Sequence, residues 1–312
     1  MSGPAVARPE GPVVAVVPDW PPAAEAVVAG GGRVGPVEEA EALVWVDWSE
    51  PGHLADVLRA NPGIRWVHLP GAGIERFLEA GVVDAGRTWT CSKGAHSTLI
   101  AEHALALALA GMHSLAVSAR ASSWQPVSVS ALRAQPVTVL GGGGIARALI
   151  DLLHPFRARV TVVRRNPVIV PGAHRTVEQG SLHEALAEAR LVVLALALTP
   201  HTRHIVDAKA LAHMHERAWL VNVARGGHVD TDALVDALEG GVIAGAALDV
   251  TDPEPLPEGH PLWAMPNCII TPHSAGASGA VMRLLAARIE DNVGRFAAGQ
   301  PLLGVVDLDA GY

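Results

Sequence analysis

The sequence predicts an α/β protein made of two doubly wound parallel-sheet domains, and three observations support this prediction. Short runs rich in valine and isoleucine alternate with helix-like segments along the chain. The later runs are almost continuously apolar, as expected for parallel strands that helices cover on both faces. With 312 residues the chain is long for one hydrophobic core, so two domains are expected.

The apolar runs form two series of expected strands. The first series covers residues 13–17, 42–46, 64–69 and 88–91. The second covers residues 136–140, 159–163, 191–198, 218–224, 243–250 and 267–271. Between the series, an Ala/Leu-rich segment predicts one long helix over 97–120. A last helix is expected over 278–298, because Gly299 and Pro301 follow it.

Composition excludes several classes of protein. With 50% hydrophobic and 17% charged residues the chain is globular rather than disordered. A formal net charge of −8, with no Lys/Arg-rich run, argues against a nucleic-acid partner. The two cysteines, Cys91 and Cys268, lack metal-binding spacing, so free thiols and no metal site are expected. We expect a cytoplasmic protein with no membrane partner, because we find neither a secretory signal nor a bilayer-spanning segment.

A glycine cluster directly follows the first strand of the second series. In VLGGGGIARALI, Gly141, Gly143 and Ala146 fit the pattern Gly-x-Gly-x-x-Gly/Ala at a strand-to-helix turn. Such a turn lets the backbone approach a pyrophosphate, and the helix N-terminus offers N–H groups to the anion. A merely flexible turn is the alternative interpretation. In this context the sequence predicts a dinucleotide-binding domain of the Rossmann type.

The next strand is expected to decide which dinucleotide binds. About 20 residues after the glycines, an acid usually receives the ribose hydroxyls of NAD. Here Arg164 and Arg165 end the strand RVTVV. Arginine can hold a 2′-phosphate, so NADP(H) is the expected cofactor and NAD(H) the alternative. The alternative is that both arginines are solvated side chains at a strand end and have no role in cofactor choice.

Three kinds of polar group follow later strands of the second series. Arg225 follows AWLVNVA, Asp249 and Glu254 lie at or after the end of IAGAALDV, and His273 follows NCIITP. Ligands of open parallel sheets bind beyond the carboxyl ends of the strands. Arg225 is expected to grip a carboxylate and polarise a 2-oxo group. His273 is expected to exchange a proton with that oxygen, and Glu254 to support the imidazolium. Each residue alone also has a purely structural explanation.

The segments NVARGGHVDTDALVDAL, AGAALDVTDPEPLPEGHPLW and TPHSAG resemble the signature segments of the D-isomer-specific 2-hydroxyacid dehydrogenases. The resemblance implies that Arg225, Glu254 and His273 are catalytic and that Asp249 lies near the nicotinamide carboxamide. It also implies cofactor contacts at Gly144, Ile145, Thr199, Val223 and Ala224. Substrate contacts are implied at the backbone of Ala72, Gly73 and Ile74, and at Ser97.

The same resemblance implies the domain organisation. A flavodoxin-like substrate-binding domain would cover residues 1–97, completed by 285–312, and the dinucleotide-binding domain would cover 98–284. The active site would lie in the cleft between the domains, and the protein would be a homodimer. Trp124, in WQP, resembles a residue that reaches into the partner subunit in hydroxypyruvate reductases, although a core position is the alternative.

Departures from the family pattern narrow the substrate. Arg164 replaces the usual acid, as in NADPH-using glyoxylate/hydroxypyruvate reductases, and Thr251 stands where an aromatic residue is common. Leu69 replaces the arginine of phosphoglycerate dehydrogenases, and residues 70–73 lack the lysine of phosphite dehydrogenases. A small anionic 2-oxo or 2-hydroxy acid, such as glyoxylate or hydroxypyruvate, is therefore expected. A nucleotide-sensing corepressor of the same fold is the alternative.

Overall fold

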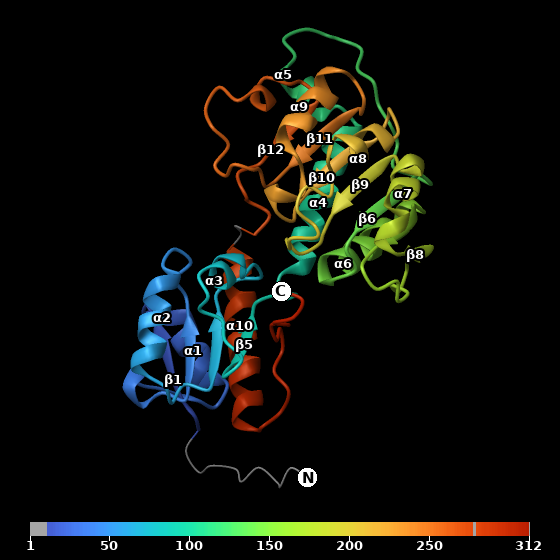
Figure 1. The fold of residues 1–312 in the computed structure, drawn as a ribbon. Coiled ribbons are helices and arrows are strands. Elements are labelled where there is room, and N and C mark those ends of the chain that lie inside the picture. The colour runs from blue at the N-terminus through green and yellow to red at the C-terminus, as the bar shows by residue number, and fades with distance from the viewer. Residues whose placement is uncertain (1–10, 277–278, 312) are drawn as a thin grey trace. The chain divides into compact units, whose positions relative to one another are not determined.

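The computed structural model describes residues 11–276 and 279–311 (Figure 1). The chain divides into two compact units, Met1–His96 with Ser278–Tyr312, and Ser97–Ala277. Each unit contains one parallel β-sheet with helices packed on it. This architecture confirms the prediction of two α/β domains.

The first unit has a five-stranded sheet in the order β2-β1-β3-β4-β5. Its strands are β1 (Val13–Val17), β2 (Arg33–Val34), β3 (Ala42–Trp45), β4 (Trp66–Leu69) and β5 (Thr88–Cys91). Its α-helices are α1 (Pro21–Ala29), α2 (Pro51–Ala60), α3 (Glu75–Glu79) and α10 (Gly279–Ala297). The edge strand β2 was not predicted, because two residues are too few to produce a recognisable alternation.

Apolar residues cover both faces of this sheet. On one face Val27 of α1 and Val293 of α10 pack against Val14 and Trp66. The C-terminal tail also belongs to this unit, since the amide of Val306 donates to the carbonyl of Trp89, 2.9 Å away. The end of the chain thus runs beside β5, where it covers the edge of the sheet.

The second unit has a seven-stranded sheet in the order β12-β11-β10-β9-β6-β7-β8. Its strands are β6 (Pro136–Leu140), β7 (Arg159–Val163), β8 (Arg175–Val177), β9 (Leu191–Leu194), β10 (Trp219–Asn222), β11 (Gly245–Leu248) and β12 (Cys268–Ile270). Its α-helices are α4 (Ser97–Met112), α5 (Leu115–Arg120), α6 (Gly144–Leu153), α7 (Leu182–Glu188), α8 (Ala208–His213) and α9 (Thr231–Glu239). The strand order reverses between β6 and β9, which creates the switch point where such sheets bind ligands.

The register of this sheet brings its strand ends together. Leu140 pairs with Leu194, and Asn222 pairs with both Leu194 and Leu248. Leu248 in turn pairs with Ile270. The carboxyl ends of β6, β9, β10, β11 and β12 are therefore level, and the residues that follow them share one edge.

The prediction of one helix over 97–120 is wrong. Ser114 has the left-handed backbone conformation, with φ of 52°, and separates α4 from α5. Its hydroxyl donates to the carbonyl of Ser128, 2.5 Å away, and the amide of Ser130 donates to the carbonyl of Met112, 2.8 Å away. The loop that follows α5 thus caps the end of α4. Serine competes with helical bonding in this way, and the apolar pattern does not reveal it.

None of the helices in residues 11–276 and 279–311 combines the length and the apolar run needed to cross a bilayer. Over the same residues, no three His, Cys, Asp or Glu side chains gather closely enough to hold a metal ion.

Candidate active site

The turn between β6 and α6 is tightly constrained at its first glycine. Gly141 has a φ of 106°, which side-chain-bearing residues rarely adopt. A Cβ atom there would lie 2.2 Å from the carbonyl oxygen of Ala195, the residue after β9. Glycine therefore lets the chain turn directly beside the neighbouring strand end.

The N-terminus of α6 is open where a pyrophosphate would bind. Gly143 caps the helix, and a Cβ atom added there would meet no other atom within 4 Å. Gly144 and Ile145 form the first turn, while Ala146 is fully buried against the sheet. Unpaired N–H groups and the positive end of the helix dipole favour an anion here. The residues of this turn fit a bound dinucleotide.

Arg164, directly after β7, lies against the same turn. A Cβ atom at Gly142 would be 3.1 Å from its Cδ and 3.2 Å from its Nε. Its Nη1 donates weakly to the carbonyl of Val168, 3.4 Å away. Arg165 is exposed beside it. The structure thus places Arg164 at the glycine turn and Arg165 on the adjoining surface.

Three further expected cofactor contacts follow β9 and β10; β9 pairs with β6, and β10 pairs with β9. The amide of Thr199 donates to the hydroxyl of Thr202, 2.8 Å away, and that hydroxyl donates to the carbonyl of Ala197, also 2.8 Å away. Val223 and Ala224 are each 5% exposed, so their backbone rather than their side chains can face a ligand.

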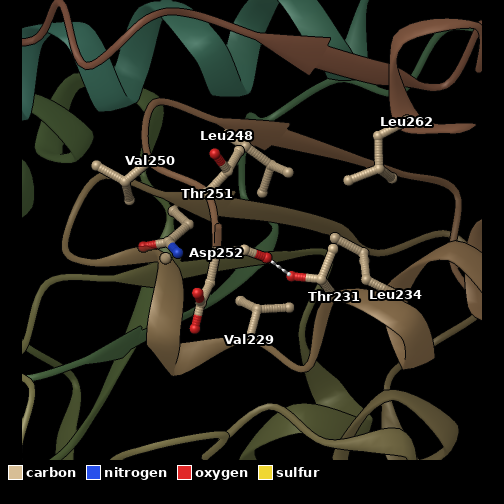
Figure 2. A pocket seen from close by; sticks show the side chains of 10 residues that line it. Val229, Thr231, Leu234, Leu248, Val250, Thr251, Asp252 and Leu262 are labelled. Carbon is tan, nitrogen blue, oxygen red and sulfur yellow. Dashed lines mark hydrogen bonds between the residues drawn. The ribbon is translucent and has the colours of Figure 1, made fainter. Parts of the chain in front are cut away.

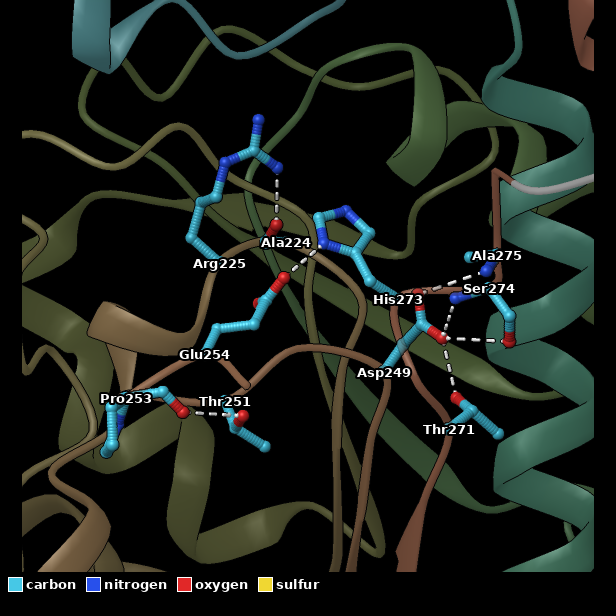
Figure 3. Close-up of polar contacts among 10 residues, drawn as sticks. All are labelled: Ala224, Arg225, Asp249, Thr251, Pro253, Glu254, Thr271, His273, Ser274 and Ala275. Carbon is cyan, nitrogen blue, oxygen red and sulfur yellow. Dashed lines mark hydrogen bonds and ion pairs between the residues drawn. The ribbon is translucent and has the colours of Figure 1, made fainter. Parts of the chain in front are cut away.

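Asn222, which the sequence reasoning missed, shapes the turn that carries Arg225. Its Nδ2 donates to the carbonyl of Arg225, 2.8 Å away, and its Oδ1 accepts from the amide of Ala224, 3.0 Å away. The Nη1 of Arg225 donates to the carbonyl of Ala224, 2.7 Å away (Figure 3). The sequence did contain a signal for this role, because Asn222 is a polar residue at the end of an apolar strand. The structure shows that it is fully buried there.

Glu254 and His273 form a carboxylate–imidazole pair. The Nδ1 of His273 lies 2.7 Å from the Oε1 of Glu254, and both side chains are about half exposed. Figure 3 shows the guanidinium of Arg225 extending to the same side of the sheet edge as this pair. The bond to Glu254 occupies Nδ1, so Nε2 is the nitrogen that can exchange a proton with a ligand.

Asp249 anchors the turn that presents His273. Its Oδ1 accepts from the hydroxyl of Thr271 at 2.6 Å and the amide of Ser274 at 2.8 Å, and its Oδ2 accepts from the amide of Ala275 at 3.1 Å. The carbonyl of Asp249 accepts from the amide of His273 at 2.8 Å. These bonds hold His273 in a left-handed conformation, with φ of 51°. The buried carboxylate therefore has a positioning role that the sequence did not indicate.

A histidine of α4 completes this anchor. The Nε2 of His103 lies 3.2 Å from Oδ1 of Asp249 and 3.1 Å from the hydroxyl of Thr271. His103 lies 168 residues before Thr271 in the sequence. Its polar contact could not be read from local spacing.

The segments that carry Arg225 and Glu254 are in direct backbone contact. A Cβ atom at Gly226 would lie 1.9 Å from the carbonyl oxygen of Thr251. The hydroxyl of Thr231 donates to the carbonyl of Asp252, 2.6 Å away (Figure 2). A cavity of about 10 Å³, roughly the room one water needs, lies beside these contacts. The segments that carry Arg225 and Glu254 are thus packed directly against each other at Gly226 and Thr251.

The expected substrate residues lie far from Arg225, Glu254 and His273 in the sequence and belong mainly to the first unit. Ala72, Gly73 and Ile74 follow β4; Ala72 is exposed and Ile74 is buried. Ser97 begins α4 in the second unit and is 8% exposed. Arg225, Glu254 and His273 all belong to the second unit.

Comparisons with known proteins identify the family of the chain. Residues 103–275 match the family described as D-isomer specific 2-hydroxyacid dehydrogenase, NAD binding domain. The chain is 30% identical over 282 residues to a glyoxylate/hydroxypyruvate reductase A of Serratia proteamaculans, covering 87% of each chain.

Two solved structures are similar along nearly the whole chain. One is a D-isomer specific 2-hydroxyacid dehydrogenase from Xanthobacter autotrophicus, in complex with NADPH and MES. It is 31% identical in sequence and has a TM-score of 0.85, and the match covers 97% of this chain and 100% of that one. The other is an NADPH-dependent glyoxylate/hydroxypyruvate reductase from Sinorhizobium meliloti, in complex with NADP and sulfate. It is 26% identical in sequence and has a TM-score of 0.78, and the match covers 97% of this chain and 100% of that one.

The fold, the glycine turn and these comparisons together define an oxidoreductase with an NAD(P)-binding domain. The chain belongs to the D-isomer specific 2-hydroxyacid dehydrogenase family, whose members act on 2-hydroxy acids. This confirms the family that the sequence segments indicated.

The contact at Gly226 yields a prediction. We expect Gly226→Ala to lower the free energy of unfolding by about 1–3 kcal/mol, because the new methyl group must push against the backbone at Thr251. A shift of Glu254 relative to Arg225 is expected to lower kcat/KM for a 2-oxo acid by at least about tenfold. Urea unfolding and steady-state kinetics measure the two effects.

Gly180→Ala is the matched control in the same unit, since the nearest atom to its new Cβ is an ordinary 3.8 Å away. Equal stability and equal kcat/KM for the two variants would contradict the coupling of Arg225 to Glu254.

Proposed function

We propose that the protein is an NADPH-dependent reductase of a small 2-oxo acid such as glyoxylate or hydroxypyruvate. The observation that supports this most is the His273–Glu254 pair at 2.7 Å, on the strand edge that also carries Arg225. A cation and a protonatable imidazole on one edge suit the reduction of a carbonyl group in an anion.

Arg225, His273 and Glu254 each have a separate role in the proposed reduction. The guanidinium of Arg225 binds the substrate carboxylate and polarises the 2-oxo group. The Nε2 of His273 donates a proton to the carbonyl oxygen, and Glu254 stabilises the imidazolium from the opposite nitrogen. NADPH supplies the hydride. In the reverse direction Nε2 accepts the proton from the hydroxyl group.

Substrate binding is assigned to two further segments. The backbone N–H groups of Ala72, Gly73 and Ile74 would receive the substrate carboxylate, and the hydroxyl of Ser97 would face the nicotinamide. Leu69 and the absence of lysine from residues 70–73 favour a small unphosphorylated acid. The relatives named glyoxylate/hydroxypyruvate reductases support the same substrate class.

Cofactor preference is assigned to the end of β7. Arg164 lies against the glycine turn and Arg165 is exposed beside it, so both can meet a 2′-phosphate. NADPH or NADP is named in the two similar solved structures. Gly141, Gly143, Gly144 and Ile145 would cradle the pyrophosphate, and the segments at Thr199, Val223, Ala224 and Asp249 would line the nicotinamide half. A corepressor function is not favoured, because the relatives are named as reductases.

The first prediction concerns His273. A panel of 2-oxo acids with NADPH is expected to give turnover, with glyoxylate or hydroxypyruvate as the best substrate. His273→Ala is expected to lower kcat by about 10²- to 10⁴-fold, the usual contribution of proton transfer, while the Kd of NADPH stays unchanged. Stopped-flow absorbance and nucleotide fluorescence measure these quantities.

His154→Ala is the matched control, because His154 is exposed at the opposite end of α6 from the glycine turn. Turnover near the wild-type rate in His273→Ala would remove this residue from the reaction.

The second prediction concerns the cofactor. The KM for NADPH is expected to be about tenfold to a hundredfold below that for NADH, since each charge-assisted hydrogen bond contributes about 1.5–3 kcal/mol. The double variant Arg164→Ala/Arg165→Ala is expected to abolish this difference.

Arg159→Ala, at the other end of the same strand, is expected to keep the preference. The assignment fails if the wild-type protein uses NADH as well as NADPH, although the reductase assignment would survive.

A third prediction concerns assembly, which we propose to be a homodimer. The side chain of Trp124 is fully exposed, and Leu115 and Val129 are each 54% exposed on the neighbouring segments. Three large apolar side chains exposed within residues 115–129 are the observation that supports an interface here. Light scattering is expected to give twice the chain mass, and Trp124→Ser/Leu115→Ser to shift the particle towards the monomer. A monomeric wild-type protein would refute the proposal.

A further inference from the structure

A set of buried polar side chains lies beneath the loop that follows β4. Trp66 and His68 lie on β4, Thr90 lies on β5, and Ser92 follows β5. All four are at most 1% exposed, although the surrounding core is apolar. Most buried polar groups have hydrogen-bond partners, so the partners of these four side chains show which parts of the fold they connect.

The four side chains form one continuous chain of hydrogen bonds. The Nε1 of Trp66 donates to the hydroxyl of Thr90, 2.8 Å away. The Nδ1 of His68 lies 2.9 Å from the same hydroxyl, and its Nε2 lies 3.3 Å from the hydroxyl of Ser92. A neutral imidazole has one donor and one acceptor, so two hydroxyl partners satisfy both nitrogens.

The ring of His68 is neutral near pH 7. Burial lowers its pKa from the usual 6.5 to about 3, and the positive charge of Arg288 acts in the same direction. His68 therefore serves neither as a charge nor as a proton donor in the reaction. It acts through its two fixed hydrogen bonds.

The last member of the chain holds the loop itself. The amide of Ser92 donates to the carbonyl of Gly71, 2.8 Å away, and the Sγ of Cys91 lies 3.7 Å from the carbonyl of Ala72. The pairing of Leu69 with Cys91 brings these strand ends level. The ring of Trp48 covers the other side, since a Cβ atom at Gly71 would lie 1.5 Å from it.

We propose that His68 is a positioning residue for the substrate loop: through Ser92 it fixes Gly71, and thereby orients the N–H groups of Ala72, Gly73 and Ile74 towards a carboxylate. This inference rests on the proposed function, in which those N–H groups bind the substrate. Donors that are held in place before binding need no reordering when the anion arrives.

Two substitutions separate the two bonds of His68. The amide of Gln reaches the place of Nε2, so His68→Gln keeps the bond to Ser92. The amide of Asn reaches only the place of Nδ1, so His68→Asn keeps the bond to Thr90 and loses Ser92. We expect the KM for glyoxylate to rise about tenfold in His68→Asn and about twofold or less in His68→Gln, as for the loss of one hydrogen bond. The kcat at saturation and the Kd of NADPH should stay unchanged in both.

Asn292→Ala is the control for a merely structural role. Asn292 is also fully buried in the first unit, but it bonds the backbone of Leu303 rather than the loop. It is expected to lower the melting temperature without changing the KM. Equal KM values for His68→Asn and His68→Gln, or a rise in KM with Asn292→Ala, would overturn the inference.

Amide hydrogen exchange gives a readout that needs no substrate. The amides of residues 71–74 are expected to exchange faster in His68→Asn than in His68→Gln. If the wild-type protein reduced no 2-oxo acid, the proposed function would fail, while this exchange would still decide whether His68 holds the loop. Equal exchange in both variants would reject the positioning role.

Discussion

The hydrogen bonding of one buried carboxylate sets the geometry of the sheet edge that carries His273. Asp249 is 2% exposed, and a charge so far from water is costly unless donors surround it. Its donors come from the segment 271–275 and from His103. The backbone of this segment therefore has little freedom to adopt another conformation. His273 has a left-handed conformation because of the bonds to Asp249 and not because histidine favours that conformation.

The two carboxylates that precede and follow Thr251 have contrasting surroundings. Asp249 is enclosed and bonded mainly to backbone amides and hydroxyls, so it acts as a fixed part of the scaffold. Glu254 is about half exposed and bonded to the ring of His273. The close approach of Gly226 to the backbone of Thr251 and the bond from the Thr231 hydroxyl to the carbonyl of Asp252 hold the segment that joins them. A rigid support thus lies next to a side chain that remains accessible to a ligand.

The sequence predicted the glycine turn and ten of the twelve strands in the described residues, because these depend on local patterns, but it missed the short edge strands β2 and β8. Continuous apolar runs mark buried parallel strands, and Gly141 stands where the chain must turn beside Ala195. The polar residues at strand ends could be named for the same reason, since their distance from the strands is short. The contact of His103 with Thr271 could not be predicted, because 168 residues of chain separate them. The break at Ser114 depends on Ser128 and Ser130 in a distant loop, and the apolar pattern of the helix continues across it. The buried bonds of His68 likewise depend on the neighbouring strand rather than on nearby sequence.

The strand order of the second sheet has a consequence for how such a protein can diverge. Arg164 follows β7, whereas Arg225, Glu254 and His273 follow β10, β11 and β12. With neighbouring strands about 4.8 Å apart, three strand spacings separate β7 from β10, or roughly 14 Å. Substitutions at the end of β7 can therefore accumulate without disturbing the hydrogen bonds around Asp249. Descendants of one ancestor could exchange one nucleotide for another while the chemistry at the far strands stayed the same.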